Sequence, residues 1–187
     1  MRIRLIVVCA LMIVGAALLS IHAAGRQQNP SQKPSPPASA KCSLPNGGTI
    51  TVDYSSPRMR GRKIYGDLVP WGKVWRAGAN AATTFVPSVD VRVGNLEVPA
   101  VSGGYTIFVI PEEAKWTLIV NKRTGEWGIP YTAELESMEL GRTDMKVSSF
   151  ADPLENFTIA FDQTATGCTL RMDWETTRSS VDIAPKK

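Results

Sequence analysis

Six basic side chains crowd one stretch of the chain, residues 57–80, which we call the cationic loop. They are Arg58, Arg60, Arg62, Lys63, Lys73 and Arg76. Asp67 is the single acidic residue in the same stretch. Guanidinium groups bind carboxylates and phosphates through paired, charge-assisted hydrogen bonds. We therefore predict a binding site for a small polar or anionic ligand in this stretch. Its proposed contacts are four cations and one neutral donor: Arg58, Arg62, Lys63, Arg76 and Asn80.

Two tryptophans beside glycines extend this prediction toward a saccharide. Trp71 and Trp127 each precede a glycine in a turn, where an indole face can stack on a sugar ring or a cation. The other tryptophans of the domain, Trp75, Trp116 and Trp174, are expected in the core, because large aromatic side chains are mostly buried. The arginines have a structural alternative too: they could bind loop carbonyls and pair with acids of the domain.

The composition excludes several kinds of catalysis. The only histidine, His22, lies in the N-terminal leader, so serine–histidine and cysteine–histidine nucleophiles are excluded from the domain, as are histidine-ligated zinc and copper sites. Carboxylate or lysine chemistry stays open, with Lys63 and Lys73 as the lysines. The candidate carboxylates have no spacing that singles out a pair: Glu112, Glu113, Glu126 and Glu134. We assign no catalytic residue, no metal and no cofactor.

The net charge of +4 does not describe the domain. Seven of the 21 basic residues lie in the leader, the linker and the C-terminal tail, which leaves 14 against 17 acidic residues within 42–185. Nucleic-acid binding requires a basic domain rather than basic ends, so we expect no nucleic-acid partner. The domain is mildly acidic and carries one cationic segment.

The elements that must position these residues begin after an export signal. A short basic start, an apolar run over residues 5–19 and the small residues 23–25 are typical of a signal peptide, assigned to residues 1–25. An uncleaved anchor is the alternative, since residues 5–21 could span a bilayer. Either interpretation predicts an extracytoplasmic domain, whether periplasmic, secreted or membrane-tethered, that meets the membrane only through its N-terminal segment. Residues 26–41, rich in proline, serine and glutamine, predict a disordered linker.

Cys42 and Cys168 are the cysteines left once the leader is set aside. In an oxidising compartment an isolated pair indicates one disulfide, and two unrelated thiols are the alternative. The bridge would tie the start of the domain to its penultimate strand.

The rest of the chain predicts one all-β domain over residues 42–185. Short alternating runs separated by turn signals indicate an antiparallel β-sandwich or flattened barrel of about nine strands. At most one short helix is expected, at residues 133–140. The expected strands are 49–54, 83–86, 89–93, 96–98, 105–110, 115–120, 144–149, 156–162, 169–174 and 179–183. The cationic loop combines glycine and proline with buried-type apolar residues, so we expect one long ordered loop.

The string SPRMRGRKIYGDLVPWGKVWRAGANAATTF closely resembles the signature of a bacterial family known as domain of unknown function 2911. The resemblance continues through VPAVSGGYTIFVIP, WTLIVNKRTGEWG and NFTIAF, and covers residues 49–183. It implies an exported, β-rich domain and supplies no reaction and no catalytic residues.

These observations favour a non-enzymatic domain that binds a small polar or anionic ligand, plausibly a saccharide, between the cationic loop and the turn at residues 121–128. One alternative is a protein–protein interaction module of the cell envelope, whose partner would be another envelope protein. Another is a hydrolase that uses carboxylates or lysine without histidine. The sequence leaves the oligomeric state open.

Overall fold

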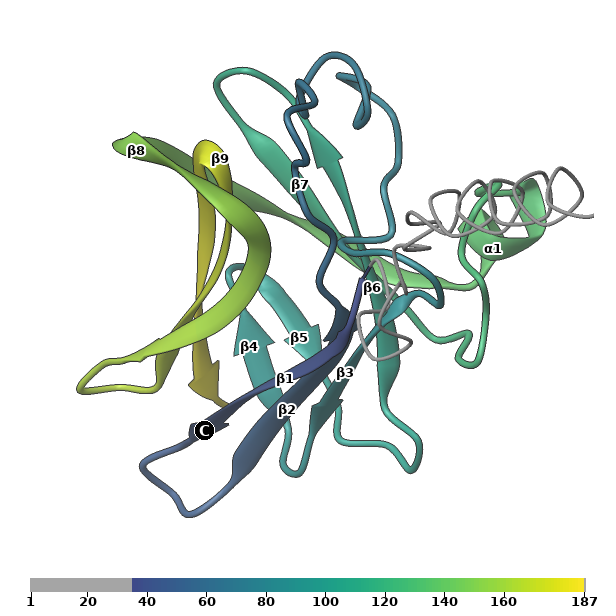
Figure 1. Ribbon diagram of the computed structural model, residues 1–187. Coiled ribbons are helices and arrows are strands. Elements are labelled where there is room, and N and C mark those ends of the chain that lie inside the picture. The colour runs from purple at the N-terminus through teal and green to yellow at the C-terminus, as the bar shows by residue number, and fades with distance from the viewer. Residues whose placement is uncertain (1–34, 187) are drawn as a thin grey trace, which may run out of the picture. The chain divides into compact units, whose positions relative to one another are not determined.

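The computed structural model describes residues 35–186 (Figure 1). The predicted signal peptide and residues 26–34 of the predicted linker lie outside this range. The described chain forms nine strands and one helix, in this order: β1 Pro37–Ser43, β2 Thr49–Ser55, β3 Thr83–Pro87, β4 Val91–Val93, β5 Leu96–Val98, β6 Tyr105–Pro111, β7 Trp116–Asn121, α1 Ala133–Ser137, β8 Glu139–Gln163 and β9 Cys168–Pro185.

All strand pairs are antiparallel, in the order β1-β2-β3-β6-β7-β8-β9-β4-β5. The long strand β8 belongs to two layers: it begins beside β7, where Met145 pairs with Trp116, and continues beside β9, where Ile159 pairs with Met172. In Figure 1 β8 and β9 run together as two long curved strands facing the layer of β6 and β7. The prediction of an all-β sandwich or flattened barrel is confirmed.

The strands fold this way because of where their apolar side chains fall. Ile50 and Val52 alternate on β2 and are both fully buried, whereas β6 is apolar at nearly every position and lies in the middle of its layer. A strand covered on both faces needs no alternation. Between the layers the aromatic rings pack together, and Trp75 stacks on Trp174 with ring centres 5.8 Å apart. The expected burial of Trp75, Trp116 and Trp174 is confirmed.

Three boundaries differ from the sequence-based expectation. The last four expected strands are two long ones, because β8 and β9 continue through irregular pairing near residues 150–157 instead of ending there. The helix stops at Ser137, since Glu139 already pairs with β7. The third difference is β1, which begins at Pro37 within the expected linker and pairs with β2 through small residues that alternate between half-buried and exposed.

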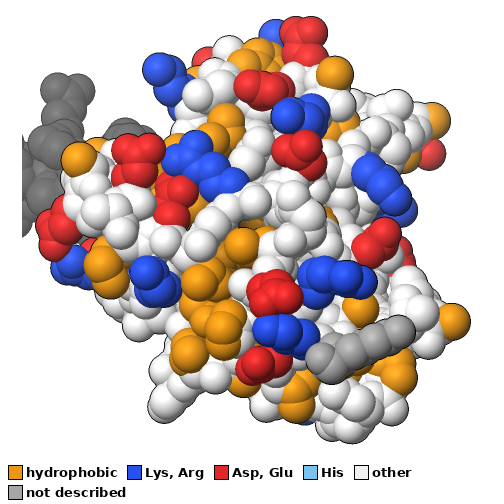
Figure 2. All heavy atoms as spheres, turned by 180° about the vertical axis from the view of Figure 1, so that it is seen from behind, with side chains coloured by type: hydrophobic (Ala, Val, Ile, Leu, Met, Phe, Trp, Pro, Cys, Tyr) orange, Lys and Arg blue, Asp and Glu red, His pale blue; other side chains and the backbone are white. Residues whose placement is uncertain are grey.

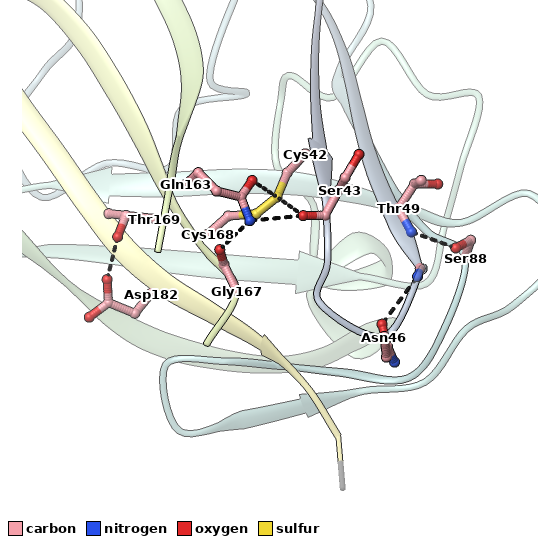
Figure 3. The surroundings of a disulfide bond; sticks show 11 residues. Cys42, Ser43, Asn46, Thr49, Ser88, Gln163, Gly167, Cys168, Thr169 and Asp182 are labelled. Carbon is pink, nitrogen blue, oxygen red and sulfur yellow. Dashed lines mark hydrogen bonds between the residues drawn. A yellow bond between two sulfur atoms is a disulfide. The ribbon is translucent and has the colours of Figure 1, made fainter. Parts of the chain in front are cut away.

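The predicted disulfide between Cys42 on β1 and Cys168 on β9 is present, with 6.6 Å between the Cα atoms (Figure 3). Gln163 reinforces the same contact: its side-chain Nε2 donates to the carbonyls of Ser43 (3.0 Å) and Gly167 (3.1 Å). The edge strand β1 is thereby tied to the hairpin that joins β8 and β9. A disulfide is consistent with an oxidising compartment.

On the face drawn in Figure 2 the acidic and basic side chains are interspersed and form no large patch of one sign. Within residues 35–186 no helix has the length and apolarity needed to cross a bilayer.

Candidate functional site

The cationic loop is ordered because it is hydrogen-bonded to both layers of the sandwich. On one side Trp75 exchanges two main-chain hydrogen bonds of 2.8 Å with Val109 on β6. On the other side the Phe157 N–H on β8 donates to the Pro57 carbonyl (2.9 Å), and the Met59 N–H donates to the Glu155 carbonyl (2.8 Å). These hydrogen bonds make the loop a bridge between the two layers. In Figure 1 the loop lies above β6 and β7. The prediction of one long ordered loop is confirmed.

Apolar side chains of the loop fasten it to the core. Ile64, Tyr65 and Val69 are buried, and the Tyr65 ring stacks on Trp71 with centres 5.5 Å apart. Burial, with the nearby acids Glu175 and Asp173, raises the pKa of the Tyr65 phenol well above its ordinary value. Its hydroxyl has no hydrogen-bond partner among residues 35–186. Trp71 is thus part of a packed aromatic cluster rather than a free stacking platform.

The loop also holds a strained backbone. Four non-glycine residues in the described chain adopt left-handed φ angles, and three of them lie in the loop: Arg60, Ala77 and Asn80. Each such residue costs on the order of 1 kcal/mol, and strain of this kind concentrates at functional sites. At Asn80 the side chain compensates by donating to the Ser55 hydroxyl (3.1 Å) and the Ser35 carbonyl (3.3 Å).

A cavity of about 320 Å³ opens beside the loop, and we call it the arginine cavity. Its lining combines three arginines with aliphatic and aromatic walls: Ser35, Pro57, Arg60, Arg62, Leu68, Val69, Trp75, Arg76, Gly78, Ala79, Ile129 and Trp174. This cavity is formed by segments that are far apart in the sequence: the cationic loop, residue 129 and β9. Its lining contains no carboxylate.

Arg76 is the most constrained of the three arginines. Its Nη1 donates to the carbonyls of Asn80 (2.8 Å) and Trp127 (3.0 Å), and its guanidinium lies over the Trp127 ring, 5.5 Å from the ring centre. Its Nε is buried with no partner among the described residues. Burial lowers the pKa of Arg76, although an arginine stays protonated at neutral pH.

Arg62 binds the main chain of the loop, and Arg58 binds Ser56 just before it. Arg62 donates to the carbonyls of Met59 (3.0 Å) and Arg58 (2.7 Å), which leaves its Nη1 without a hydrogen bond to any residue of 35–186. Arg58 donates to the Ser56 hydroxyl (2.7 Å) and is not part of the cavity lining. For Arg60, Glu155 accepts from the main-chain N–H (2.9 Å). The loop carbonyls thus occupy part, but not all, of the donor capacity that these arginines offer.

The ion pairs among residues 35–186 do not involve the cationic loop, although Arg92 outside the loop is unpaired as well. Four arginines of the described chain form ion pairs with acids, and all four lie outside the loop: Arg123, Arg142, Arg171 and Arg178. Arg178 donates two hydrogen bonds of 2.7 and 2.9 Å to the buried Asp173. Within residues 35–186 no lysine or arginine of the loop has a carboxylate oxygen within 4 Å of its side-chain nitrogens; the Glu155 carboxylate contacts only the main-chain N–H of Arg60. The structural alternative is therefore half right: side chains of the loop arginines bind main-chain carbonyls, but they do not pair with acids of the domain.

The structure gathers only part of the predicted site. Arg62 and Arg76 line the arginine cavity, whereas Trp127 touches it only through Arg76 and is 61% exposed. The other predicted contacts do not line it: Arg58, Lys63, Trp71 and Asn80. Sequence reasoning missed Leu68 and Ile129 as site residues. Their only signal was a large aliphatic side chain close to a proline in a turn.

The candidate carboxylates for hydrolysis do not gather at this cavity. Glu126 and Glu134 both pair with the Arg123 guanidinium, with Glu126 at 2.7 Å, and Glu112 and Glu113 are exposed between β6 and β7. Among residues 35–186 no cluster of three or more histidine, cysteine or acidic side chains could hold a metal ion.

A larger hollow of about 790 Å³ lies near the C-terminal end of β9. Arg92, Glu97 and Lys186 line it, and Lys186 pairs with Glu97 at 2.7 Å. Lys186 and Glu97 thus neutralise each other and Arg92 stays unpaired, whereas the described lining of the arginine cavity has three unpaired arginines and no acid. The arginine cavity is therefore the better candidate for a binding site.

Fold and site together define an all-β domain whose two layers are bridged by an ordered loop beside a cationic hollow. The chain belongs to the family described as "Protein of unknown function (DUF2911)", whose family model matches residues 35–183. The resemblance seen in the sequence is thereby confirmed. No curated protein and no solved structure matches the chain.

Proposed function

We propose that this domain binds a small anionic ligand in the arginine cavity and does so without catalysing a reaction. The observation that carries the proposal is a cavity lined by three arginines whose side chains form no ion pair among the described residues, and the described lining of this cavity includes no acidic residue. A positive, partly desolvated hollow concentrates anions, because field lines are focused where the walls have a low dielectric constant. Unused donors on Arg62 and Arg76 would then bind the ligand oxygens.

The test is a thermal-shift and calorimetric panel of phosphate, sulfate, simple carboxylates and sugar acids. A ligand that binds only the folded protein stabilises it by about 2.7 kcal/mol at a concentration of 100 Kd, which produces a saturable rise in Tm. Arg62→Gln and Arg76→Gln should each weaken binding by about ten- to a hundredfold, because a hydrogen bond to a charged group contributes about 1.5–3 kcal/mol.

Arg92→Gln is the matched control, since Arg92 is an exposed arginine that lines the other hollow. It should leave binding unchanged. A panel in which no anion raises the Tm would refute the proposal. Equal weakening by Arg92→Gln would show that only the overall charge of the protein matters.

We also propose that the domain works outside the cytoplasm. The disulfide between Cys42 and Cys168 and the leader-like residues 1–25 support this location. Fractionation of cells with alkylation of free thiols at harvest is the test, and recovery of a fully reduced protein from the cytoplasm would contradict it.

A protein partner is a second candidate function, favoured by exposed apolar side chains beside the cavity. Leu68 is 44% and Ile129 41% exposed. Trp127 is also exposed, and its ring contacts Arg76, which lines the same cavity. Cross-linking in intact cells from a photoreactive residue at position 127 tests this function. A cross-link to one envelope protein that disappears in Leu68→Ser would favour the partner over the small ligand.

A further inference from the structure

We infer that the ligand of the arginine cavity is amphiphilic: a carboxylate or phosphate head on a short apolar body, rather than a saccharide. This inference rests on the proposed function and narrows it to one chemical class. It follows from three properties of the lining, namely its polar groups, its apolar walls and its size.

The polar side chains of the lining are nearly all donors. Arg60, Arg62 and Arg76 have no acceptor, and Ser35 provides the one side-chain hydroxyl. Among residues 35–186 the lining contains no aspartate, glutamate, asparagine or glutamine. A sugar presents several hydroxyls that donate as well as accept, and a donor buried without an acceptor costs about 1–3 kcal/mol. An anionic head only accepts hydrogen bonds, so it matches a wall made of donors.

The rest of the lining is apolar and partly uncovered. Leu68 and Ile129 lie at the cavity although each remains more than two-fifths exposed, and Val69, Trp75 and Trp174 form walls that are already buried. Covering exposed aliphatic surface contributes about 25 cal/mol for each Å² removed from water. A ligand with an apolar body would gain this contribution, whereas an inorganic anion or a sugar would not.

The size of the cavity limits the apolar body. At about 320 Å³ it lies at the small end of the range for small-molecule pockets, roughly 300–1,000 Å³. It therefore suits one short chain or one ring beneath the anionic head. Charge and apolar surface lie in the same hollow, so head and body must belong to one molecule.

The cavity also provides a spectroscopic signal for binding. Trp75 and Trp174 both line it and stack on each other with ring centres 5.8 Å apart. A ligand against these rings changes their surroundings, so a change in tryptophan fluorescence should accompany binding.

The experiment is a titration of the full chain with inorganic phosphate and with methyl, butyl, hexyl and octyl phosphate, each below its micelle concentration. Affinity should rise about fourfold for each added methylene that enters the cavity and should level off once the cavity is full. Hexyltrimethylammonium, which has the same body and the opposite charge, should not bind. Galacturonate should bind no more tightly than methyl phosphate.

Two variants and a matched control assign the effect to this cavity. Leu68→Ser and Ile129→Ser should flatten the dependence on chain length and leave binding of inorganic phosphate unchanged. Val101→Ser alters a side chain of the same 44% exposure that does not line the cavity, so it should behave as the wild type. All three positions are exposed, so the substitutions should leave the fold intact.

Each outcome separates this inference from the proposed function. If inorganic phosphate binds and affinity does not depend on chain length, the inference is overturned and the proposed function stands. Tighter binding of galacturonate than of hexyl phosphate would also overturn it. If no anion binds, both fail. Displacement of octyl phosphate by phosphatidylglycerol vesicles would identify the source of the amphiphile as a lipid, and failure to displace it would identify a free solute.

Discussion

Arg76 binds Trp127 through both the side chain and the main chain of that tryptophan. The guanidinium lies 5.5 Å from the centre of the indole ring, and Nη1 donates to the Trp127 carbonyl at 3.0 Å. Because the same Nη1 also donates to the Asn80 carbonyl, one arginine joins the cationic loop to the turn at residues 121–128. This joint fixes one wall of the arginine cavity.

The joint should be measurable as a coupling free energy. We expect Arg76→Lys to lower the free energy of unfolding by about 1–2 kcal/mol, because lysine lacks the planar guanidinium that lies over the Trp127 ring while Nη1 donates to two carbonyls. Trp127→Ala should cost about 0.5–1 kcal/mol, as expected for an exposed cation–π pair. Urea unfolding of the two single variants and the double variant gives the coupling. Strictly additive effects would show that the contact contributes nothing.

Gly128 should tolerate no side chain. Its φ is +85°, and an added Cβ would lie 2.8 Å from the Ala82 Cβ and 3.0 Å from the Phe108 ring. Gly128→Ala should therefore destabilise the protein by about 2–4 kcal/mol, through backbone strain plus overpacking. Gly125→Ala is the control in the same turn: its φ is +76° with open space around the Cβ, so only the strain of about 1 kcal/mol applies. Thermal unfolding compares the two, and equal losses would contradict the predicted clash.

Removing the disulfide should lower stability without changing the fold. Cys42 and Cys168 are 126 residues apart, and the chain-entropy model gives about 5 kcal/mol at most for closing a loop of this length. We expect the Cys42→Ser, Cys168→Ser double variant to unfold at lower urea concentration with its circular dichroism retained. In a Cys9→Ser background, two titratable thiols in the unfolded, unreduced protein would show that the bridge does not form.

Stability should fall in acid partly through Glu139. Burial alone would raise the pKa of this carboxyl, but hydrogen bonds from Arg142 (2.7 and 2.8 Å) and from the Tyr131 hydroxyl (2.7 Å) outweigh it, so the pKa lies below the ordinary value of 4.5. A lowered pKa in the folded state means that the stabilisation is complete above the unfolded pKa. It is lost as the pH falls through the folded one.

The measurement is the free energy of unfolding between pH 7 and pH 3. The difference between wild type and Glu139→Gln should be largest at pH 7 and should shrink below about pH 4.5. Glu113→Gln, on the exposed connection between β6 and β7, controls for the loss of one carboxylate. If the difference in unfolding free energy between the two proteins does not change with pH, the charge of Glu139 does not contribute to stability.

The local patterns of the chain were sufficient for the fold class. Alternation in β2 and the continuous apolar run of β6 follow from which face is covered, and this information is present in neighbouring residues. The division into β8 and β9 could not be predicted in this way. The Asp152-Pro153 pair resembles a turn signal, but the pairing of β8 with β9 carries both strands through that region.

The candidate site was only partly predictable for a similar reason. The excess of arginine in the cationic loop is visible in the sequence. The glycines beside Trp127 likewise indicate an exposed turn there. Arg58 and Arg62 find their partners within four residues, but Trp127, a partner of Arg76, lies 51 residues away in the sequence and is not encoded in any local pattern. Arg58 donates to Ser56, whereas Arg76 reaches Trp127.

By itself the sequence determined the β-sandwich, the disulfide pairing, the family and the absence of histidine chemistry from the domain, because these depend on residue type and local period. Only the tertiary structure decided that Arg60, Arg62 and Arg76 share a cavity with Leu68 and Ile129. Hydrogen bonds to β6 and β8 hold the loop, and the hydrogen bond from Arg76 to the Trp127 carbonyl joins it to the turn; no local pattern encodes such long-range contacts.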